Sequence, residues 1–167
     1  MRFTDLMMAF PALLLAIALA ALLKPSLWIV AMVIALVNWV QVARIVYTET
    51  RGLVERDFIV AERSLGAGNS RIIFLHILPH LMPTAIVWGT LGIATTVLLE
   101  ATLSFLGIGL QPPAISWGTQ ISEASGIGLI RAAPHMLFFP SVFLSLTVLA
   151  FIMLGDVVRD ALDPKLR

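Results

Sequence analysis

The chain has 167 residues, of which 59% are hydrophobic and 13% are charged, and its formal net charge is +1. A soluble domain normally carries about a quarter charged residues, so this composition excludes a single water-soluble core and indicates a membrane protein. The absence of cysteine excludes a disulfide framework and a zinc ribbon.

The first expected membrane span covers residues 6–23, which are apolar throughout. Pro11 lies near its start, where a helix tolerates proline. A secretory signal is the alternative, because Arg2 precedes the stretch and residues 18–20 resemble a cleavage site. Asp5 weakens the basic leader of such a signal and further spans follow, so we favour a span.

The second expected span covers residues 27–46, and Asn38, Gln41 and Arg44 recur in it at helical spacing. Amides join neighbouring helices by hydrogen bonds, and an arginine near a helix end reaches the membrane surface. Alternatively, Asn38 and Gln41 contact a substrate on a transport path. We favour the packing role and keep the path role as the second hypothesis.

Residues 47–80 form a long polar segment between two apolar spans. A short helix is expected over residues 57–65, with Gly66 as its left-handed cap. A second helix is expected to be capped at residues 69–70 and to end at Pro79. The segment is therefore predicted to form a compact pair of helices at the membrane surface.

The third expected span covers residues 81–106. Gly89 and Gly92 favour close helix packing in it. Glu100 is different, because a carboxylate that faces lipid costs about 2.5 kcal/mol or more on insertion scales. We therefore expect Glu100 to face protein, water or a partner, with a role in a contact or a gate on the transport path.

Residues 107–134 form a second polar loop rich in glycine and proline, in which Trp117 and Ile121 predict a position on the membrane surface. The fourth expected span covers residues 135–155, and a short charged helix that stops before Pro164 follows it. The predicted fold class is therefore an all-α polytopic membrane protein with about four transmembrane helices.

Basic residues predict the orientation. Of the eleven lysines and arginines, only Lys24 and Arg131 fall on the side opposite the polar segment 47–80. Because basic residues concentrate in cytoplasmic loops, we expect both chain ends and this segment to be cytoplasmic. The residues on that side are Arg2, Arg44, Arg51, Arg56, Arg63, Arg71, Arg159, Lys165 and Arg167.

Several separate stretches resemble one family in the same order: residues 10–23, 71–80, 98–118 and 154–167. They resemble permeases of the dipeptide, oligopeptide and nickel family of ABC importers, and its C-type subunit most closely. The run Ala61, Gly66, Leu78-Pro79 resembles the EAA loop of these permeases, with Val60-Ala61-Glu62 standing where the motif has Glu-Ala-Ala. The chain begins where the third transmembrane helix of the family begins, so we expect about a third of a usual subunit to lie outside this fragment or shortened product.

The resemblance implies a type I importer permease in a bacterial or archaeal inner membrane. Its implied partners are a homologous permease subunit, two ATP-binding subunits and an extracytoplasmic substrate-binding protein, with no nucleic acid. Peptide is the implied cargo, and nickel or another solute stays open. The implied ATPase-coupling residues are Ala61, Glu62, Arg63, Gly66, Leu78 and Pro79.

No phosphate-binding sequence G-x-x-x-x-G-K-[ST] occurs. We therefore expect this chain to be no enzyme and to bind no cofactor, with ATP used on partner subunits. His76 and His80 lie four residues apart, but Pro79 is expected to break the helix between them, so no metal site is expected.

Two other functions stay open. One is a membrane scaffold or assembly subunit that does not transport and derives from a truncated permease. The other is half of an ion-coupled carrier in which Glu100 carries protons. The large helical segment 47–80 argues against the carrier, which does not need it.

Overall fold

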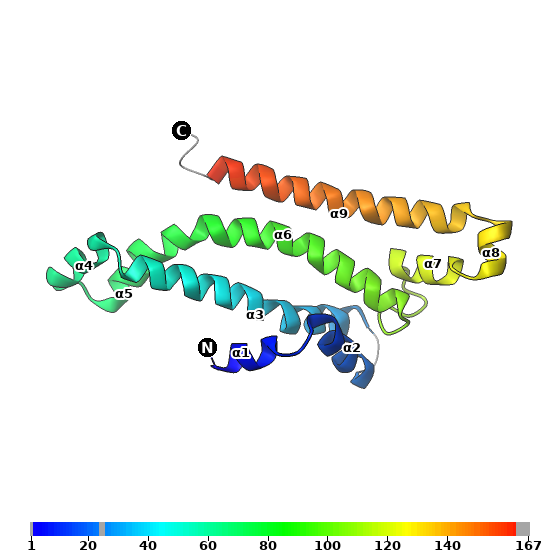
Figure 1. The fold of residues 1–167 in the computed structure, drawn as a ribbon, viewed down its shortest axis with the longest axis horizontal. Coiled ribbons are helices and arrows are strands. Elements are labelled where there is room, and N and C mark those ends of the chain that lie inside the picture. The colour runs from blue at the N-terminus through cyan, green and yellow to red at the C-terminus, as the bar shows by residue number, and fades with distance from the viewer. Residues whose placement is uncertain (1, 24–25, 163–167) are drawn as a thin grey trace.

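The computed structural model describes residues 2–23 and 26–162. Three long helices run lengthwise through it: α3 (Leu27–Val54), α6 (Leu78–Phe105) and α9 (His135–Leu162). Figure 1 shows short helices gathered at both ends of this bundle. The predicted end of the charged tail helix before Pro164 lies outside the described residues.

The lengths of the helices fit a membrane. Three helical stretches are long and apolar enough to cross one, and a bent pair near the N-terminus makes up to four. The predicted all-α class with about four spans is therefore confirmed. At 28 residues each, α3, α6 and α9 are about 42 Å long and exceed a hydrocarbon core of about 30 Å. The helices α3 and α9 therefore continue beyond the spans expected at residues 27–46 and 135–155, and the bounds of these spans stay a prediction.

The first span is not one continuous helix. It consists of α1 (Arg2–Met8) and α2 (Ala12–Leu22), which are bent by 87° relative to each other. Pro11 lies at the N-cap position of α2 with an extended ψ of 127°. The expectation that Pro11 is tolerated inside the first turns is wrong, because the chain breaks at residues 9–11 and restarts after the proline.

Pro79 does not end a helix either. The short helix α5 (Asn69–Arg71) continues into the π-helical segment η1 (Ile72–Ile77) and then into α6. Leu78 N–H donates to the Ile73 carbonyl, five residues back. In a regular α-helix the proline ring clashes with the carbonyl four residues earlier, and the wider π turn relieves that crowding. The predicted boundary between this segment and the third span is therefore wrong.

The expected side-chain cap at residues 69–70 is also wrong. Gly68 occupies the N-cap position of α5, with φ −69° and ψ 154°, and no side chain caps that end. Asn69 and Ser70 lie inside the helix and are exposed.

One apolar core joins the spans at the end away from α4. Its buried members come from α2, α3 and α6, and Ala16, Val33 and Leu103 are fully buried. Near the C-terminal end of α9, Gly155 is buried against α6. A Cβ added to Gly155 would lie 2.9 Å from Leu91 Cδ2. A glycine there lets two long helices approach closely.

The helix α7 (Trp117–Ala124) packs against both α6 and α9, and α8 (Ile127–Ala132) follows it. Ser116 and Thr119 form a reciprocal capping box at its start. Gly118 is buried, and a Cβ on it would lie 2.1 Å from the Ala101 carbonyl oxygen of α6. This part of the predicted outer loop is therefore fixed to the helix bundle.

Candidate functional site

The predicted ATPase-coupling residues lie together at one end of the molecule, in residues 55–80, which we call the helical corner. The helix α4 (Asp57–Ser64) forms its outer part, beside α5 in Figure 1. Ile59 of α4 and Ile72 of η1 are 1% and 2% exposed. They form a core with Ile77 and Leu81, against which Leu53 and Val54 of α3 pack. One apolar core therefore joins α4 to the ends of α3 and α6.

Gly66 forms the turn of the corner, as predicted. Its φ is +84°, a conformation that residues with a Cβ rarely adopt. Gly66 N–H donates to the Arg63 carbonyl, and Ala67 N–H donates to the Glu62 carbonyl, both at 3.0 Å. These two bonds make a Schellman motif, which satisfies the last carbonyls of α4. The left-handed cap predicted at Gly66 is confirmed.

Glu62 turns inward toward His76 of η1. Its Oε1 lies 3.5 Å from His76 Nε2, and the two side chains are 29% and 23% exposed. The Phe58 ring stacks on His80 at 5.5 Å and lies 6.4 Å from the His76 ring. Four side chains therefore connect α4 with η1 and the start of α6, through contacts that the sequence analysis missed.

The other predicted coupling residues face outward. Ala61 and Arg63 are exposed on α4, next to Leu65 with 84% of its surface exposed. Leu78 and Pro79 are exposed at the start of α6. The corner thus combines a fixed inner side with an outer side that carries apolar and basic groups, and Glu62 belongs to the inner side.

The polar residues of α3 have two kinds of neighbour. Asn38 Nδ2 donates to Thr96 Oγ1 of α6 at 3.4 Å. The predicted hydrogen bond from a side-chain amide to a neighbouring helix is therefore confirmed for Asn38. Gln41 is exposed and lines recesses on both sides of α3: one of about 70 Å³ beside Trp88 and Thr95, and one of about 200 Å³ beside Met7 and Met8. A path role for Asn38 and Gln41 stays a prediction.

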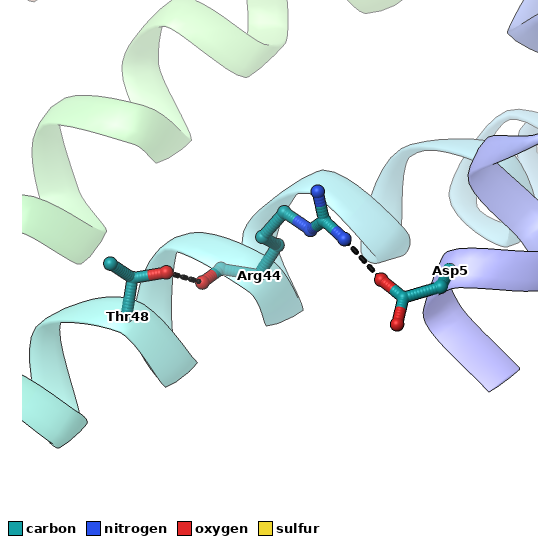
Figure 2. A network of polar contacts seen from close by, with 3 residues as sticks. All are labelled: Asp5, Arg44 and Thr48. Atoms are coloured by element: carbon teal, nitrogen blue, oxygen red, sulfur yellow. Dashed lines mark hydrogen bonds and ion pairs between the residues drawn. The ribbon is translucent and has the colours of Figure 1, made fainter. Parts of the chain in front are cut away.

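Arg44 is paired across two helices. Figure 2 shows its guanidinium directed at the Asp5 carboxylate of α1, while the Thr48 hydroxyl donates to the Arg44 carbonyl. The sequence alone gives each of these two charged residues a separate interpretation. The signal that could have joined them is that charges in apolar helices are usually paired.

Glu100 takes part in an internal contact. Ser104 Oγ donates to Glu100 Oε1 at 2.7 Å and accepts from Leu110 N–H at 3.1 Å. Gly107 ends α6 with φ +78°, and this turn brings Leu110 back to Ser104. Glu100 therefore helps to fix the start of the loop after α6, and its expected role in a gate stays a prediction.

A cleft lies between the ends of α3, α6 and α9 nearest the helical corner. It has a volume of about 360 Å³, and its lining includes Glu49 of α3, Trp88 of α6 and Arg159 of α9. A second cleft of about 380 Å³ shares Glu49 and extends to Arg56 and His80. Opposite charges therefore line the base of the corner.

The histidines do not lie as the sequence suggested. The helix continues between them, and His80 Nδ1 lies 2.8 Å from the His76 carbonyl oxygen, which accepts a hydrogen bond from this ring nitrogen. Within residues 2–23 and 26–162, no three metal-ligating side chains come together. The expectations that the chain binds no metal and no cofactor stay predictions.

Comparison with known proteins places the whole chain in one family. The family described as "Binding-protein-dependent transport system inner membrane component" matches residues 1–167. The glutathione transport system permease protein GsiD of Salmonella typhimurium is 44% identical over 167 residues, which are 100% of this chain and 54% of the relative.

Two further relatives are also permease proteins that match nearly the whole chain. The dipeptide transport system permease protein DppC of Alkalihalophilus pseudofirmus is 45% identical over 166 residues, which are 99% of this chain and 54% of the relative. The oligopeptide transport system permease protein OppC of Bacillus subtilis is 39% identical over 100% of this chain and 54% of the relative. The chain spans about half the length of these relatives, so the unmatched share is larger than the third expected.

The helices that can cross a membrane and the match over the full sequence agree with each other and with the resemblance found in the sequence. The chain is a multi-pass membrane protein that belongs to the family of inner membrane components of binding-protein-dependent transport systems.

Proposed function

We propose that this chain is a permease subunit of an ATP-driven importer for di- and oligopeptides, coupled to an ATP-binding subunit through the helical corner. Its spans form part of the translocation path, beside a homologous permease subunit. A binding protein delivers the cargo from outside, and the helical corner and both chain ends lie in the cytoplasm. The names of the relatives support a peptide as cargo.

The observation that carries the proposal is how α4 is attached. Its inner face shares a buried core with the ends of two membrane helices, through Ile59, Ile72 and Leu53. Its outer face leaves Ala61, Arg63 and Leu65 exposed. A partner bound to that face therefore moves α3 and α6 together with α4, because packed cores transmit displacement as rigid units.

The test changes the corner without touching the spans. A Cβ at Gly66 meets nothing within 4 Å in this chain, so Gly66→Val disturbs the corner itself through the positive φ, at a cost of about 1 kcal/mol or more. We expect the spans to insert normally while co-expressed ATP-binding subunits co-purify less and peptide-stimulated ATP hydrolysis falls.

The matched control is Gly68→Val, two residues away. Gly68 also has nothing within 4 Å of a built Cβ, and its φ of −69° suits any residue. Gly68→Val should therefore couple normally. If Gly66→Val keeps both co-purification and stimulated hydrolysis at the control level, the corner is not the coupling element, and the scaffold function becomes the better explanation.

A further inference from the structure

Two opposite charges line one cleft at the base of the helical corner without pairing. Glu49 of α3 and Arg159 of α9 both belong to the lining of the cleft of about 360 Å³. In the part of the chain that the structure describes, neither side chain forms an ion pair or a hydrogen bond. Glu49 is half-buried, and a carboxylate in such a place is costly unless another group neutralises it. The cleft therefore offers a ligand two charges of opposite sign.

The charged end of the cleft lies at the depth of lipid headgroups. Arg159 is about 36 Å along α9 from His135, beyond a hydrocarbon core of about 30 Å. The apolar span expected on α3 ends at residue 46, just before Glu49. Trp88 also lines the cleft, and tryptophan is enriched at this level of a membrane. Both charges therefore lie in the polar layer of the leaflet next to the helical corner.

The other end of the cleft is apolar. Val87 and Leu91 line it about one and two turns along α6 from Thr84, in the direction away from the corner. Leu91 lies against Gly155 of α9, so the two helices touch there and the cleft lies between them on the corner side. Its volume falls in the usual range of ligand sites, about 300–1,000 Å³. A cleft that runs from charges at the membrane surface to apolar side chains inside the membrane matches a phospholipid.

We propose that this cleft binds phosphatidylethanolamine, a phospholipid whose headgroup carries a phosphate and a primary amine. The Arg159 guanidinium binds the phosphate, and the Glu49 carboxylate binds the ammonium group. The first methylene groups of the acyl chains lie against Val87 and Leu91. The inference goes beyond the proposed function and holds whatever the cargo is.

The charges of the cleft favour this headgroup over the other common ones. Phosphatidylglycerol has a phosphate for Arg159 but no cation for Glu49. Phosphatidylcholine has a cation, but its quaternary ammonium has no N–H to donate to a carboxylate. Only the primary ammonium of phosphatidylethanolamine adds a charge-assisted hydrogen bond to Glu49. Arg56 lines the neighbouring cleft, which shares Glu49, and attracts the phosphate of any of these lipids.

The experiment crosslinks the lipid in place. The complete complex is purified from its membrane into nanodiscs that contain a phosphatidylethanolamine with a diazirine in one acyl chain, and mass spectrometry identifies the labelled peptides. Wild type should be labelled at residues 83–91. Unlabelled phosphatidylethanolamine should compete at least about tenfold better than phosphatidylcholine or phosphatidylglycerol, because each of these lacks one charge-assisted contact.

Variants assign each half of the headgroup. Glu49→Gln should remove the preference for phosphatidylethanolamine over phosphatidylcholine, because the ammonium loses its charged acceptor. Arg159→Gln should lower the labelling several-fold against every competitor, because the phosphate loses its guanidinium. Glu55→Gln and Arg51→Gln are the matched controls: both residues are exposed at the same end of α3 and lie outside the lining of this cleft. Both controls should be labelled as wild type is.

Three results would each overturn the proposal. Equal competition by the three lipids in wild type means that only an ordinary boundary lipid lies there. The absence of label at residues 83–91 means that another subunit, or another part of the protein, covers the cleft. A Glu49→Gln variant that keeps the preference for phosphatidylethanolamine means that the amine is recognised elsewhere.

Discussion

Ser104 is the residue on which the end of α6 depends. Its hydroxyl donates to Glu100 and accepts the Leu110 N–H, and it is 2% exposed. Next to it, a Cβ on Gly109 would lie 2.2 Å from Ser104 Oγ, so the turn fits closely around this hydroxyl. Glu100 thus has an internal partner whether or not it also faces a path.

Ser104→Ala should destabilise the protein by about 1–3 kcal/mol, because it leaves the buried Leu110 N–H without an acceptor. Glu100→Gln keeps an acceptor oxygen, so it should cost about 1 kcal/mol or less. Thermal unfolding of the purified protein in detergent measures both changes.

Ser145→Ala is the control for Ser104→Ala. The Ser145 hydroxyl is exposed and donates only to the Ser141 carbonyl of its own helix, at 2.8 Å. Its removal should change the unfolding temperature little. If Ser104→Ala unfolds at the same temperature as Ser145→Ala, the contact does not stabilise the loop.

At the scale of elements, α7 depends on one close approach to α6. Gly118 lies against the Ala101 carbonyl, and the Ser122 hydroxyl donates to the Phe105 carbonyl at 2.8 Å. The helix is eight residues long, too short to be stable alone in water. Its position therefore comes from these contacts and from its packing on α9.

Gly118→Ala should displace α7 and destabilise the protein by about 1–3 kcal/mol, as overpacking does in tight interfaces. Gly128→Ala in α8 is the matched control, because a Cβ there meets nothing within 4 Å. It should leave stability unchanged or raise it slightly. Limited proteolysis of the α7–α8 segment reports the displacement, and equal protection in both variants would mean that α7 does not rest on Gly118.

The sequence predicted those features of the fold that depend on the conformational preference of a single residue. Gly66 is the cap of α4 because only a residue without Cβ adopts φ +84° readily, and that is visible in sequence. Pro79 was wrongly predicted to end a helix. The π turn that accommodates it depends on hydrogen bonds from an N–H to the carbonyl five residues earlier, and no sequence signal marks such a turn. Thr96 could not be named as the partner of Asn38, since the two residues lie 58 residues apart. For Arg44 and Asp5, which lie 39 residues apart, the sequence signals only that charges in apolar helices pair, and not which two charges do so.

At the scale of the whole molecule, the proposed orientation in the membrane can be tested by labelling each end. The helical corner and the α7–α8 end lie at opposite ends of the long helices in Figure 1. The chain has no cysteine, so a single introduced cysteine gives an unambiguous label.

A cysteine at Gly126 should react with an impermeant thiol reagent added to intact cells, because the distribution of basic residues predicts that this end lies outside. A cysteine at Ser64, on the exposed surface of α4, should react only after permeabilisation. Both substitutions are exposed, so reactivity reports the side of the membrane and not burial. The reverse pattern would contradict the proposed orientation and the docking of a cytoplasmic ATPase.

The π segment at Ile72–Ile77 has a mechanical consequence. Because the chain does not break at Pro79, residues Asn69–Phe105 form one span of 37 residues, which is a rod about 55 Å long. If such a rod tilts by about 10° about its midpoint, each end moves by about 5 Å in opposite directions. Since α7 rests on the far end, a small rotation at the helical corner would become a sideways shift of the α7–α8 end of the protein, without any relay of individual side chains.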